Sequence, residues 1–404
     1  MSRLNELIAE LCPDGVPFRK IKEVYTRLKG TPITAGKMKE IENLDGEIKI
    51  FAGGKTVINA REEDIPNANI TRVPAVLVQS RGVIDFIYYE EPFTFKNEMW
   101  AYTAENKTTV KYLYYILKNN TAHFRDAASG MGSLPQISLP VTEDFIIPVP
   151  PLEVQEEIVR ILDTFTELIA ELTVKLTTEL TVRKKQYEYY HNYLMDFSKR
   201  TDISWCSVGD YFTFKNGINK GKEFFGEGNY IVNFTDVYNH RWLTKEMLKG
   251  RIKTEPRDLI AYDAKKGDLF FTRTSETKED IGMVSTLLDD IEGCVFSGFV
   301  LRARPLSKNW LPKFCSYYFS SSEVRKEIVR YASFTTRALT SGPRLSKLKI
   351  PLISIEEQQY IVDILDNFNT LYNDITKELS AEIAARQKQY EYYRDKLLTF
   401  KELS

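Results

Sequence analysis

The chain has 404 residues, of which 43% are hydrophobic and 27% charged, and this length exceeds that of one ordinary domain. The formal net charge of −1 counts against a protein that coats nucleic acid without sequence preference, because such binding rests mainly on phosphate neutralisation. A protein whose basic residues gather on one face stays compatible with this charge.

The N-terminal residues 1–12 lack a basic segment followed by an apolar core, so they do not predict a signal peptide. No apolar run approaches the roughly 20 residues that cross a bilayer. The cysteines form no Cys-x-x-Cys pair, which favours buried free thiols over a zinc site. They are Cys12, Cys206, Cys294 and Cys315. We therefore expect a cytoplasmic protein with no membrane segment and no metal site.

Residues 1–147 predict a first mixed α/β domain with short strands. Its clearest strand is the apolar run Ala75–Val78, which continues into a polar turn at Gln79–Gly82. An aromatic helix is expected over Val110–Leu117, and a Gly- and Ser-rich loop follows over Ser129–Gln136.

Residues 148–200 predict a long helix that acts as a spacer. Prolines at its start and the acidic first-turn residues Glu153 and Glu156 are typical of a helix beginning. No Pro or Gly interrupts the segment after that. At 1.5 Å per residue, some 43 residues would make a rod of about 65 Å.

Residues 201–350 predict a second domain of the same kind. The run Asp268–Thr274 repeats the order of apolar strand, hydroxyl, arginine and small residue seen around Arg81. A helix is expected over Leu311–Phe319 and a Thr-rich loop over Ser333–Thr340. The glycines between Gly217 and Gly228 do not have the spacing of a dinucleotide site and favour a surface loop.

Residues 351–404 predict a second long helix that copies the first at a constant offset of 203. The six residues Lys185–Tyr190 return whole as Lys388–Tyr393, and Ile161-Leu162-Asp163 returns as Ile364-Leu365-Asp366. Six consecutive identities in so mixed a composition show a real internal repeat. The order is therefore domain, helix, domain, helix, with the divergence confined to the domains.

Apolar residues in both helices recur at alternating steps of three and four, which is typical of a coiled-coil seam. The predicted seam passes through Leu168 and Leu371, with an extra step of four between Leu172 and Leu176 and between Ile375 and Leu379. We expect the two copies to pair within one chain as an antiparallel coiled coil. Helices lying across separate cores, and a coiled coil between two chains, are the alternatives.

Several polar residues could contact DNA, since an arginine can offer a bidentate fork to guanine, and amides and hydroxyls can read base edges. For Arg81 and Arg273, a surface or salt-bridging role is the alternative. The candidates lie at strand ends, in polar turns and in the loops before the long helices: Gln79, Ser80, Arg81, Lys96, Asn97, Ser133, Gln136, Lys215, Asn216, Arg273, Thr274, Ser275, Thr335, Thr336 and Arg337.

The duplicated Lys-Gln-Tyr-Glu-Tyr-Tyr hexads could offer aromatic platforms to bases, but their helical spacing favours seam packing together with a docking surface for a partner. The candidates for partner docking are Lys185, Gln186, Tyr187, Tyr190, Lys388, Gln389, Tyr390 and Tyr393.

Motifs of covalent chemistry are missing from the sequence. It has no Gly-x-x-x-x-Gly-Lys-Ser/Thr phosphate loop, no Gly-x-Ser-x-Gly elbow, no His-Glu-x-x-His and no Asn/Asp-Pro-Pro-aromatic motif. Its histidines, His123, His191 and His240, lie far apart in sequence. We expect a chain that is not itself an enzyme and binds no cofactor.

The helical segments carry a resemblance to a known family. The Ile-Val-x-Ile-Leu-Asp-x-Phe block at Ile158 and Ile361, and the Arg-x-Lys-Gln-Tyr-Glu-Tyr-Tyr block at Arg183 and Arg386, resemble the specificity subunit of Type I restriction–modification systems, in particular its IC branch. The resemblance covers the whole architecture. Target-recognition domains vary freely in this family, so it assigns no base-contacting residue.

The resemblance implies an α+β fold in which two mixed α/β target-recognition domains are joined by two long antiparallel helices as a pseudo-two-fold circular repeat. Each domain would read one half of a bipartite double-stranded DNA target. Two methyltransferase subunits would dock and bring S-adenosylmethionine. Restriction subunits would bring ATP and Mg, and the assembly would lie in the cytoplasm of a prokaryotic cell, associated with its nucleoid.

Two further features fit the resemblance. The tetrads Ala170–Thr173 and Thr178–Thr181 are of one type, and similar tetrads in this branch set the spacer between half-sites. The C-terminal residues 400–404 parallel Phe197–Arg200, so residues 1–15 are expected to continue that linker in a circular repeat.

A duplicated scaffold that holds two unlike domains suits the reading of two unlike targets at a fixed separation. The rival hypotheses are a coiled-coil scaffold that organises proteins without touching DNA, and a nuclease or self-sufficient restriction–methylation enzyme. The missing catalytic motifs count against the last of these.

Overall fold

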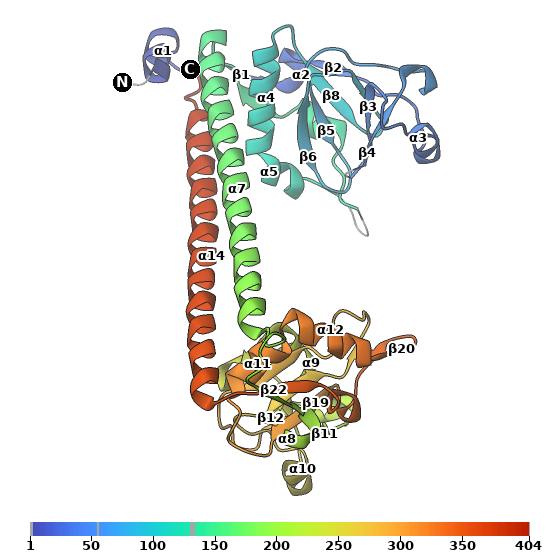
Figure 1. Cartoon of the computed structure of the whole chain (residues 1–404). Coiled ribbons are helices and arrows are strands. Elements are labelled where there is room, and N and C mark those ends of the chain that lie inside the picture. Colours follow the sequence, from blue (N-terminus) through green and yellow to red (C-terminus); the bar gives the residue numbers. More distant parts are fainter. Residues whose placement is uncertain (1–2, 55, 130–133, 404) are drawn as a thin grey trace. The chain divides into compact units, whose positions relative to one another are not determined.

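The computed structural model describes residues 3–54, 56–129 and 134–403 and divides into two compact units. Unit 1 comprises Met1–Leu176 with Leu379–Ser404, and unit 2 comprises Thr177–Glu378. Each unit contains one mixed α/β domain and part of both long helices, α7 (Leu152–Met195) and α14 (Ile355–Leu397) (Figure 1). Within the described ranges, no helix is long and apolar enough to cross a membrane.

The domain of unit 1 contains nine strands, six helices and one 3-10 turn among its described residues. In chain order these elements are α1 (Arg3–Leu11), β1 (Phe18–Lys20), α2 (Ile21–Val24), β2 (Thr26–Leu28), α3 (Ala35–Ile41), β3 (Ile48–Phe51), β4 (Val57–Ala60), η1 (Glu62–Asp64), β5 (Ala75–Gln79), β6 (Asp85–Tyr89), β7 (Phe93–Phe95), β8 (Trp100–Thr103), α4 (Lys107–Asn119), α5 (Thr121–Asp126), α6 (Leu139–Glu143) and β9 (Ile146–Pro148).

The core of unit 1 lies on both faces of a four-stranded sheet ordered β2-β8-β5-β6. Strand β5 alternates between the two faces: Val76 and Val78 pack with α4 and the start of α7, whereas Ala75 and Leu77 pack under the smaller sheet β4-β3-β7. Figure 1 shows α4 between this sheet and α7. A sheet buried on both faces explains why β5 is apolar throughout.

The domain of unit 2 repeats this arrangement with longer connections. Its elements are β10 (Ser204–Ser207), α8 (Val208–Tyr211), β11 (Phe212–Asn216), η2 (Lys222–Phe224), β12 (Phe225–Val232), α9 (Phe234–Asn239), β13 (Trp242–Leu243), η3 (Lys245–Met247), β14 (Arg251–Ile252), α10 (Pro256–Ala261), β15 (Leu269–Thr272), β16 (Thr274–Ser275), β17 (Val284–Leu287), β18 (Val295–Phe296), β19 (Val300–Pro305), α11 (Pro312–Phe319), α12 (Ser322–Tyr331), β20 (Ser333–Phe334), β21 (Ala338–Leu339), α13 (Gly342–Leu345) and β22 (Lys349–Leu352).

The sheet topologies show that the duplication covers the domains as well as the helices. The order β11-β19-β15-β17-β13 matches β2-β8-β5-β6 with one strand added. In the smaller sheets, β3 pairs antiparallel with β4 and parallel with β7, and β12 pairs in the same way with β14 and β18. The pair β1-β9 likewise corresponds to β10-β22.

The long helices pair in antiparallel fashion, as the sequence predicts. In unit 1 the rings of Phe165 and Tyr393 stack at 6.0 Å, and in unit 2 those of Phe368 and Tyr190 stack at 5.1 Å. The two contacts are copies of each other at the offset of 203. Because both contacts are made within one chain, they confirm the predicted pairing of the two copies; the start of each helix also packs in a domain core, as Ile158 does in unit 1 and Ile361 in unit 2.

The predicted seam is wrong by one residue at one position in each helix, Leu168 in α7 and Leu371 in α14. Leu168 and Leu371 are 55% and 59% exposed, whereas Ile169 and Tyr372 are half-buried. The seam of α7 therefore has two successive steps of four, from Ile161 to Phe165 and from Phe165 to Ile169. The extra step lies seven residues, about two turns, before the predicted one between Leu172 and Leu176. A leucine directly before the true position, Leu168 before Ile169 and Leu371 before Tyr372, made the two registers equivalent in sequence.

Two loop predictions in unit 2 are also wrong. The Ser333–Thr340 segment forms the short strands β20 and β21, which pair with each other, and β21 also pairs with β16. Part of the Gly217–Gly228 loop is strand β12. Gly228 has φ +99° there, and a Cβ atom would lie 2.6 Å from the carbonyl oxygen of Ile252, so glycine permits the close pairing with β14.

The two ends of the chain meet in unit 1, where Figure 1 marks both termini. The amide of Val16 donates to Lys401 O at 2.9 Å, and the amide of Leu403 donates to Val16 O at 2.9 Å. Leu4 and Cys12 are buried in the same core as Leu398. The N-terminal segment thus continues the C-terminal helix, as a circular repeat requires.

Candidate nucleic-acid interface

Strand-end site 1 is formed where β5 of unit 1 ends against the segment before α6, and it comprises residues 79–82 and 134–137. The amide of Ile137 donates to Ser80 O, and that of Gly82 donates to Pro135 O. Arg81 lies opposite Gln136 in an isolated β-bridge, and both are exposed. This pairing brings together two predicted candidates that are 55 residues apart in sequence. Ser133 lies outside the described residues.

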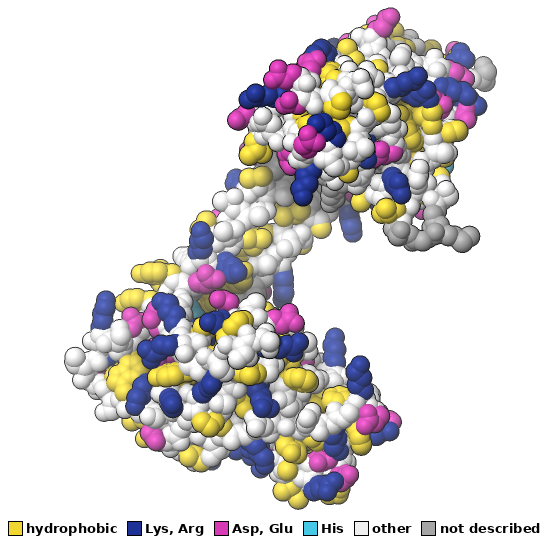
Figure 2. Space-filling view, turned by 90° about the vertical axis from the view of Figure 1, so that its right-hand side faces the viewer, with side chains coloured by type: hydrophobic (Ala, Val, Ile, Leu, Met, Phe, Trp, Pro, Cys, Tyr) yellow, Lys and Arg dark blue, Asp and Glu magenta, His cyan; other side chains and the backbone are white. Residues whose placement is uncertain are grey.

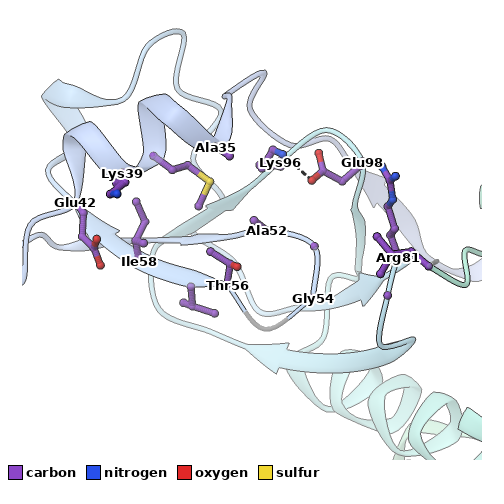
Figure 3. Close-up of a pocket in the computed structure, with 15 residues that line it drawn as sticks. Ala35, Lys39, Glu42, Ala52, Gly54, Thr56, Ile58, Arg81, Lys96 and Glu98 are labelled. Carbon is purple, nitrogen blue, oxygen red and sulfur yellow. Dashed lines mark ion pairs between the residues drawn. The ribbon is translucent and has the colours of Figure 1, made fainter. Parts of the chain in front are cut away.

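A pocket of about 670 Å³ opens beside strand-end site 1. In Figure 3, Arg81 lies at one end of it, and Lys39 and Glu42 lie at the other. Lys96 also lines the pocket, but its Nζ is 2.8 Å from Glu98 Oε1. The candidate Lys96 is therefore held in an ion pair, whereas its neighbour Asn97 is exposed.

Strand-end site 2 is the equivalent region of unit 2 and comprises residues 272–275 and 333–340. Thr274 and Ser275 pair with Leu339 and Ala338. With Arg337 they line a pocket of about 400 Å³, whose other walls include Phe299 and Tyr238. Thr335, Thr336 and Arg337 are exposed at the turn between β20 and β21. The structure thus assembles five of the predicted candidates at one place.

Exposed apolar side chains accompany both strand-end sites and were missed in the sequence. Leu134 is 51% exposed at strand-end site 1, while Phe299 is 59% and Phe334 46% exposed at strand-end site 2. Large apolar side chains next to polar ones can contact thymine methyl groups. For Phe299, the turn sequence Ser297-Gly298 before it was the available signal that this aromatic residue lies outside a strand core.

The predicted equivalence of Arg81 and Arg273 is wrong by one residue. Ser80 O accepts from the amide of Ile137, and Arg273 O accepts from that of Thr340, which is Ile137 shifted by the repeat offset of 203. Arg81 therefore corresponds to Thr274. A slip of one residue reverses the face on which a strand side chain lies. Arg273 accordingly is half-buried and donates from Nη1 to Gly298 O at 3.3 Å.

Two further candidates are structural in this chain. Gln79 is 5% exposed and donates from Nε2 to Gly54 O at 2.7 Å. Ser80 is fully buried and its hydroxyl donates to Glu98 O at 2.6 Å. Both side chains hold the end of β5 through hydrogen bonds inside the domain, whereas Arg81, the next residue, is exposed. Lys215 and Asn216 are exposed on β11, where Lys215 Nζ lies 5.6 Å from the centre of the Tyr262 ring.

Positive charge gathers in the second domain. Residues 201–350 contain 24 Lys and Arg against 18 Asp and Glu, a formal charge of +6, although the whole chain carries −1. Figure 2 shows Lys and Arg side chains over much of the visible face of this domain, with fewer acidic ones among them. Such a surplus suits a surface that approaches phosphates.

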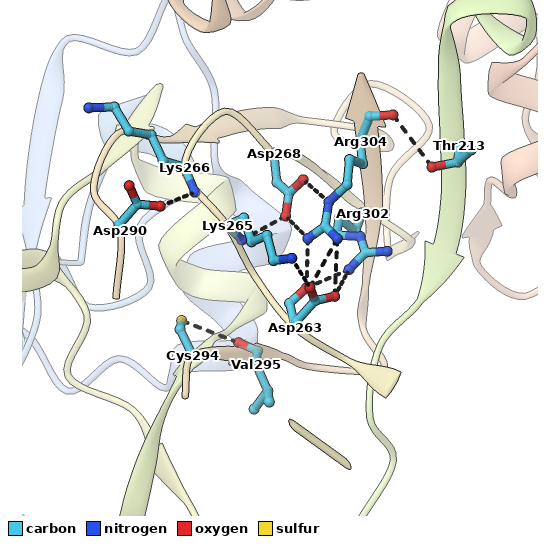
Figure 4. A network of polar contacts seen from close by, with 10 residues as sticks. All are labelled: Thr213, Asp263, Lys265, Lys266, Asp268, Asp290, Cys294, Val295, Arg302 and Arg304. Carbon is cyan, nitrogen blue, oxygen red and sulfur yellow. Dashed lines mark hydrogen bonds and ion pairs between the residues drawn. The ribbon is translucent and has the colours of Figure 1, made fainter. Parts of the chain in front are cut away.

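Some of these basic residues are engaged in an internal network (Figure 4). Arg304 binds Asp268 at 2.7 Å and Asp263 at 3.0 Å, and Arg302 binds Asp263 at 2.5 Å. Burial raises the pKa of Asp263, but the hydrogen bonds from Arg304, Lys265 and Arg302 outweigh it and lower that pKa to about 2. These arginines hold the loop before β15 against β19, so they are not available to a ligand.

An equivalent polar contact fastens each domain to its long helix. In unit 1 the carboxylate of Asp163 on α7 accepts from Lys111 Nζ at 2.7 Å and from the Tyr115 hydroxyl at 2.5 Å. In unit 2 that of Asp366 on α14 accepts from Lys313 Nζ at 2.6 Å and from the Tyr317 hydroxyl at 2.7 Å. The aromatic helices α4 and α11 therefore fix the orientation of each domain on its helix.

The hexad residues divide between the helix seam and the surface. Tyr187 stacks on Tyr372 at 6.1 Å in unit 2, and the Tyr390 hydroxyl lies 3.3 Å from that of Thr166 in unit 1, which places these tyrosines in the seam. Lys185, Gln186, Lys388 and Gln389 are exposed. The middle tyrosines of the hexads, Tyr189 and Tyr392, are 64% and 63% exposed and were not predicted as docking residues. Each lies between two seam tyrosines and therefore points away from the seam, which was the available signal.

Comparison with known proteins finds the Type I restriction modification DNA specificity domain twice in the chain, at residues 13–182 and 201–385. The specificity subunit of the type I restriction enzyme EcoR124I/EcoR124II from Escherichia coli is 34% identical over 380 residues, which cover 87% of each chain. The EcoprrI specificity subunit from Escherichia coli is 26% identical over 276 residues, 66% of this chain and 63% of the relative.

Solved structures share the fold. A chain of a type I R-M system superimposes with a TM-score of 0.71 at 14% identity and covers 96% of this chain and 98% of its own length. The HsdS subunit from Thermoanaerobacter tengcongensis gives a TM-score of 0.53 at 14% identity, with 96% of this chain and 97% of that one covered.

Proposed function

The chain belongs to the family of type I restriction–modification DNA specificity subunits, and we propose that each of its two units binds one half of a bipartite target in double-stranded DNA. The observation that carries this proposal is the duplicated domain with two unlike strand-end sites. Equivalent backbone pairing at both sites presents different exposed side chains: Arg81 and Gln136 in unit 1, and Thr274, Ser275 and Arg337 in unit 2. One scaffold can thus read two different sequences.

In this proposal the chain recognises DNA and organises partners but carries out no covalent step. The exposed tyrosines Tyr189 and Tyr392 and the groove of about 420 Å³ between the helices of unit 1, lined by Leu168 and Arg386, support docking of two methyltransferase subunits. Those subunits would bind S-adenosylmethionine. Restriction subunits joining the same assembly would bind ATP and Mg. The specificity subunit itself would need no cofactor.

A scaffold that organises proteins without DNA recognition is not favoured, because the matching family is one of DNA specificity domains. Sequencing of methylated bases across the genome of the source cell, with and without the gene, tests the proposal. We expect methylation of one split motif to disappear when the gene is deleted. Unchanged methylation of every split motif would contradict the proposal.

A further inference from the structure

Most arginines of this chain are engaged with other side chains or with carbonyl groups. Among the residues that the structure describes, the guanidinium groups of four arginines make no hydrogen bond, ion pair or ring contact. They are Arg3, Arg19, Arg81 and Arg337. Arg3 and Arg19 lie in α1 and β1, far along the chain from either strand-end site. The other two lie one at each strand-end site.

The two unpaired arginines occupy opposite strands of equivalent pairs. Arg81 follows β5, and its counterpart in unit 2 is Thr274. Arg337 precedes β21, and at the offset of 203 its counterpart in unit 1 is Leu134. Each site thus has a single exposed guanidinium. In unit 1 it lies on the segment that follows β5, whereas in unit 2 it lies on the later segment that pairs with that region. An alignment of the strands alone does not find this relation.

Three cationic side chains near Arg81 and Arg337 are, in contrast, bound to other groups of the protein. Lys96 next to Arg81 is bound to Glu98, and Arg344 near Arg337 donates from Nη1 to Leu339 O at 3.2 Å. Arg273 is likewise bound to Gly298 O. Because Lys96, Arg344 and Arg273 are bound within the protein, Arg81 and Arg337 are the guanidinium groups left to meet a ligand at each site.

We propose that Arg81 reads a guanine in one half-site and Arg337 reads a guanine in the other, each through a bidentate contact to O6 and N7 in the major groove. This inference rests on the proposed function and names the bases that two of its contacts recognise. The planar fork of arginine matches the two acceptors of guanine, and this is the commonest specific contact between proteins and DNA. The fork would lie on different strands of the two strand-end sites, so the two guanines would hold different positions in their half-sites.

The test uses the assembled complex of this chain with its methyltransferase subunits and duplexes carrying the target found by genome methylation. Each guanine of the target is replaced in turn by 7-deazaguanine, which removes the N7 acceptor and keeps base pairing. We expect one substitution in each half-site to weaken binding about tenfold or more. Arg81→Gln should abolish the effect of one of these substitutions and leave the other intact, and Arg337→Gln should do the reverse.

Arg81→Lys keeps the charge but loses the fork, so it should lose discrimination at the same guanine while retaining its salt dependence. Arg19→Gln removes an unpaired arginine that belongs to neither strand-end site. It should change neither the discrimination at the guanine nor the salt dependence of binding. Thermal unfolding of each variant shows whether it is folded.

Three results would overturn the inference and leave the proposed function intact: a half-site without guanine, an equal loss of binding to all sequences in Arg81→Gln, as for a phosphate contact, or an unchanged 7-deazaguanine effect in both variants. Failure of the wild-type complex to prefer any split target would instead contradict the proposed function itself.

Discussion

Among single residues, one aspartate in each long helix binds that helix to the neighbouring domain. Asp163 and Asp366 each accept from one lysine and one tyrosine of the neighbouring aromatic helix. Burial, and then the hydrogen bond to the aspartate, raises the pKa of Tyr115 and of Tyr317, so both hydroxyls stay protonated donors. The duplicated contact indicates that the angle of each domain on its helix is fixed by the same three side chains.

Asp366→Asn should destabilise unit 2, and Asp163→Asn should destabilise unit 1. Loss of the charge leaves a partly buried lysine without its partner, and we expect a loss of about 1–3 kcal/mol in the free energy of unfolding. Hydrogen exchange should rise in α11 for the first variant and in α4 for the second. Asp374→Asn, on the exposed side of α14, is the control. Equal effects on both helices in either variant would contradict a local role.

A buried histidine makes the stability of unit 2 depend on pH. His191 is 5% exposed, and its Nε2 lies 2.9 Å from Tyr317 O. Burial, and then the charge of Arg241, lower the pKa of His191 to about 4, although the hydrogen bond to Tyr317 opposes them. An unfolded histidine titrates near 6.5. Because the folded pKa is depressed, the stability is complete above about pH 6.5 and is lost as the pH falls towards 4.

As the pH falls from 6.5 to 4, the preference of unfolded His191 for a proton should reduce the free energy of unfolding of unit 2 by at most about 1.4 kcal/mol per pH unit. His191→Gln should flatten the dependence, and His240→Gln, at an exposed position, should not. Denaturant unfolding at pH 7, 6 and 5 provides the comparison. Equal losses of stability in the wild type and in His191→Gln over this range would contradict the role of His191.

Sequence patterns identified the strand-end regions but not which side chains are free. Arg81 and Arg273 look alike in sequence because each follows an apolar strand and a hydroxyl residue. Backbone pairing makes Arg81 exposed and Arg273 half-buried, because Arg273 occupies the position equivalent to buried Ser80. That pairing joins β5 to a segment more than fifty residues later in the chain, and no local pattern contains this information.

At the scale of elements, the long helices were the most predictable part of the fold. Their apolar spacing, their acidic starts and the absence of Pro and Gly all favour an unbroken helix, and α7 and α14 contain 44 and 43 residues. The exact seam was not predictable, because Leu168 and Ile169 are adjacent apolar residues. Packing against the partner helix selects Ile169.

Helix length should set the gap between half-sites, a prediction that follows from the family resemblance. Removing Thr178–Thr181 from α7 together with Lys377–Ser380 from α14 shortens both helices by about 6 Å, or roughly one to two base pairs. We expect selected targets to keep both half-sites with a gap shorter by that amount. Exchange of Thr178–Thr181 for four alanines keeps the length and should keep the gap. The same gap in the shortened variant would refute the spacer role.

At the scale of the whole molecule, the repeat explains both the symmetry and the asymmetry of the protein. The helices, the sheet topology and the aspartate contacts recur, and the N-terminal segment meets the C-terminal end to complete a circular order. The sequence revealed this order through six identical residues in each helix. It could not reveal the side chains that differ at the strand-end sites, because these depend on connections of unequal length in the two domains.

If the two unlike units read two separate half-sites, the DNA that the protein selects should carry both. Affinity selection from a library of random duplexes, with the purified complex of this chain and its methyltransferase subunits, tests it most directly. We expect two conserved blocks of different sequence, separated by a gap of constant length and no base preference. Recovery of a single continuous block, or of no consensus, would contradict it.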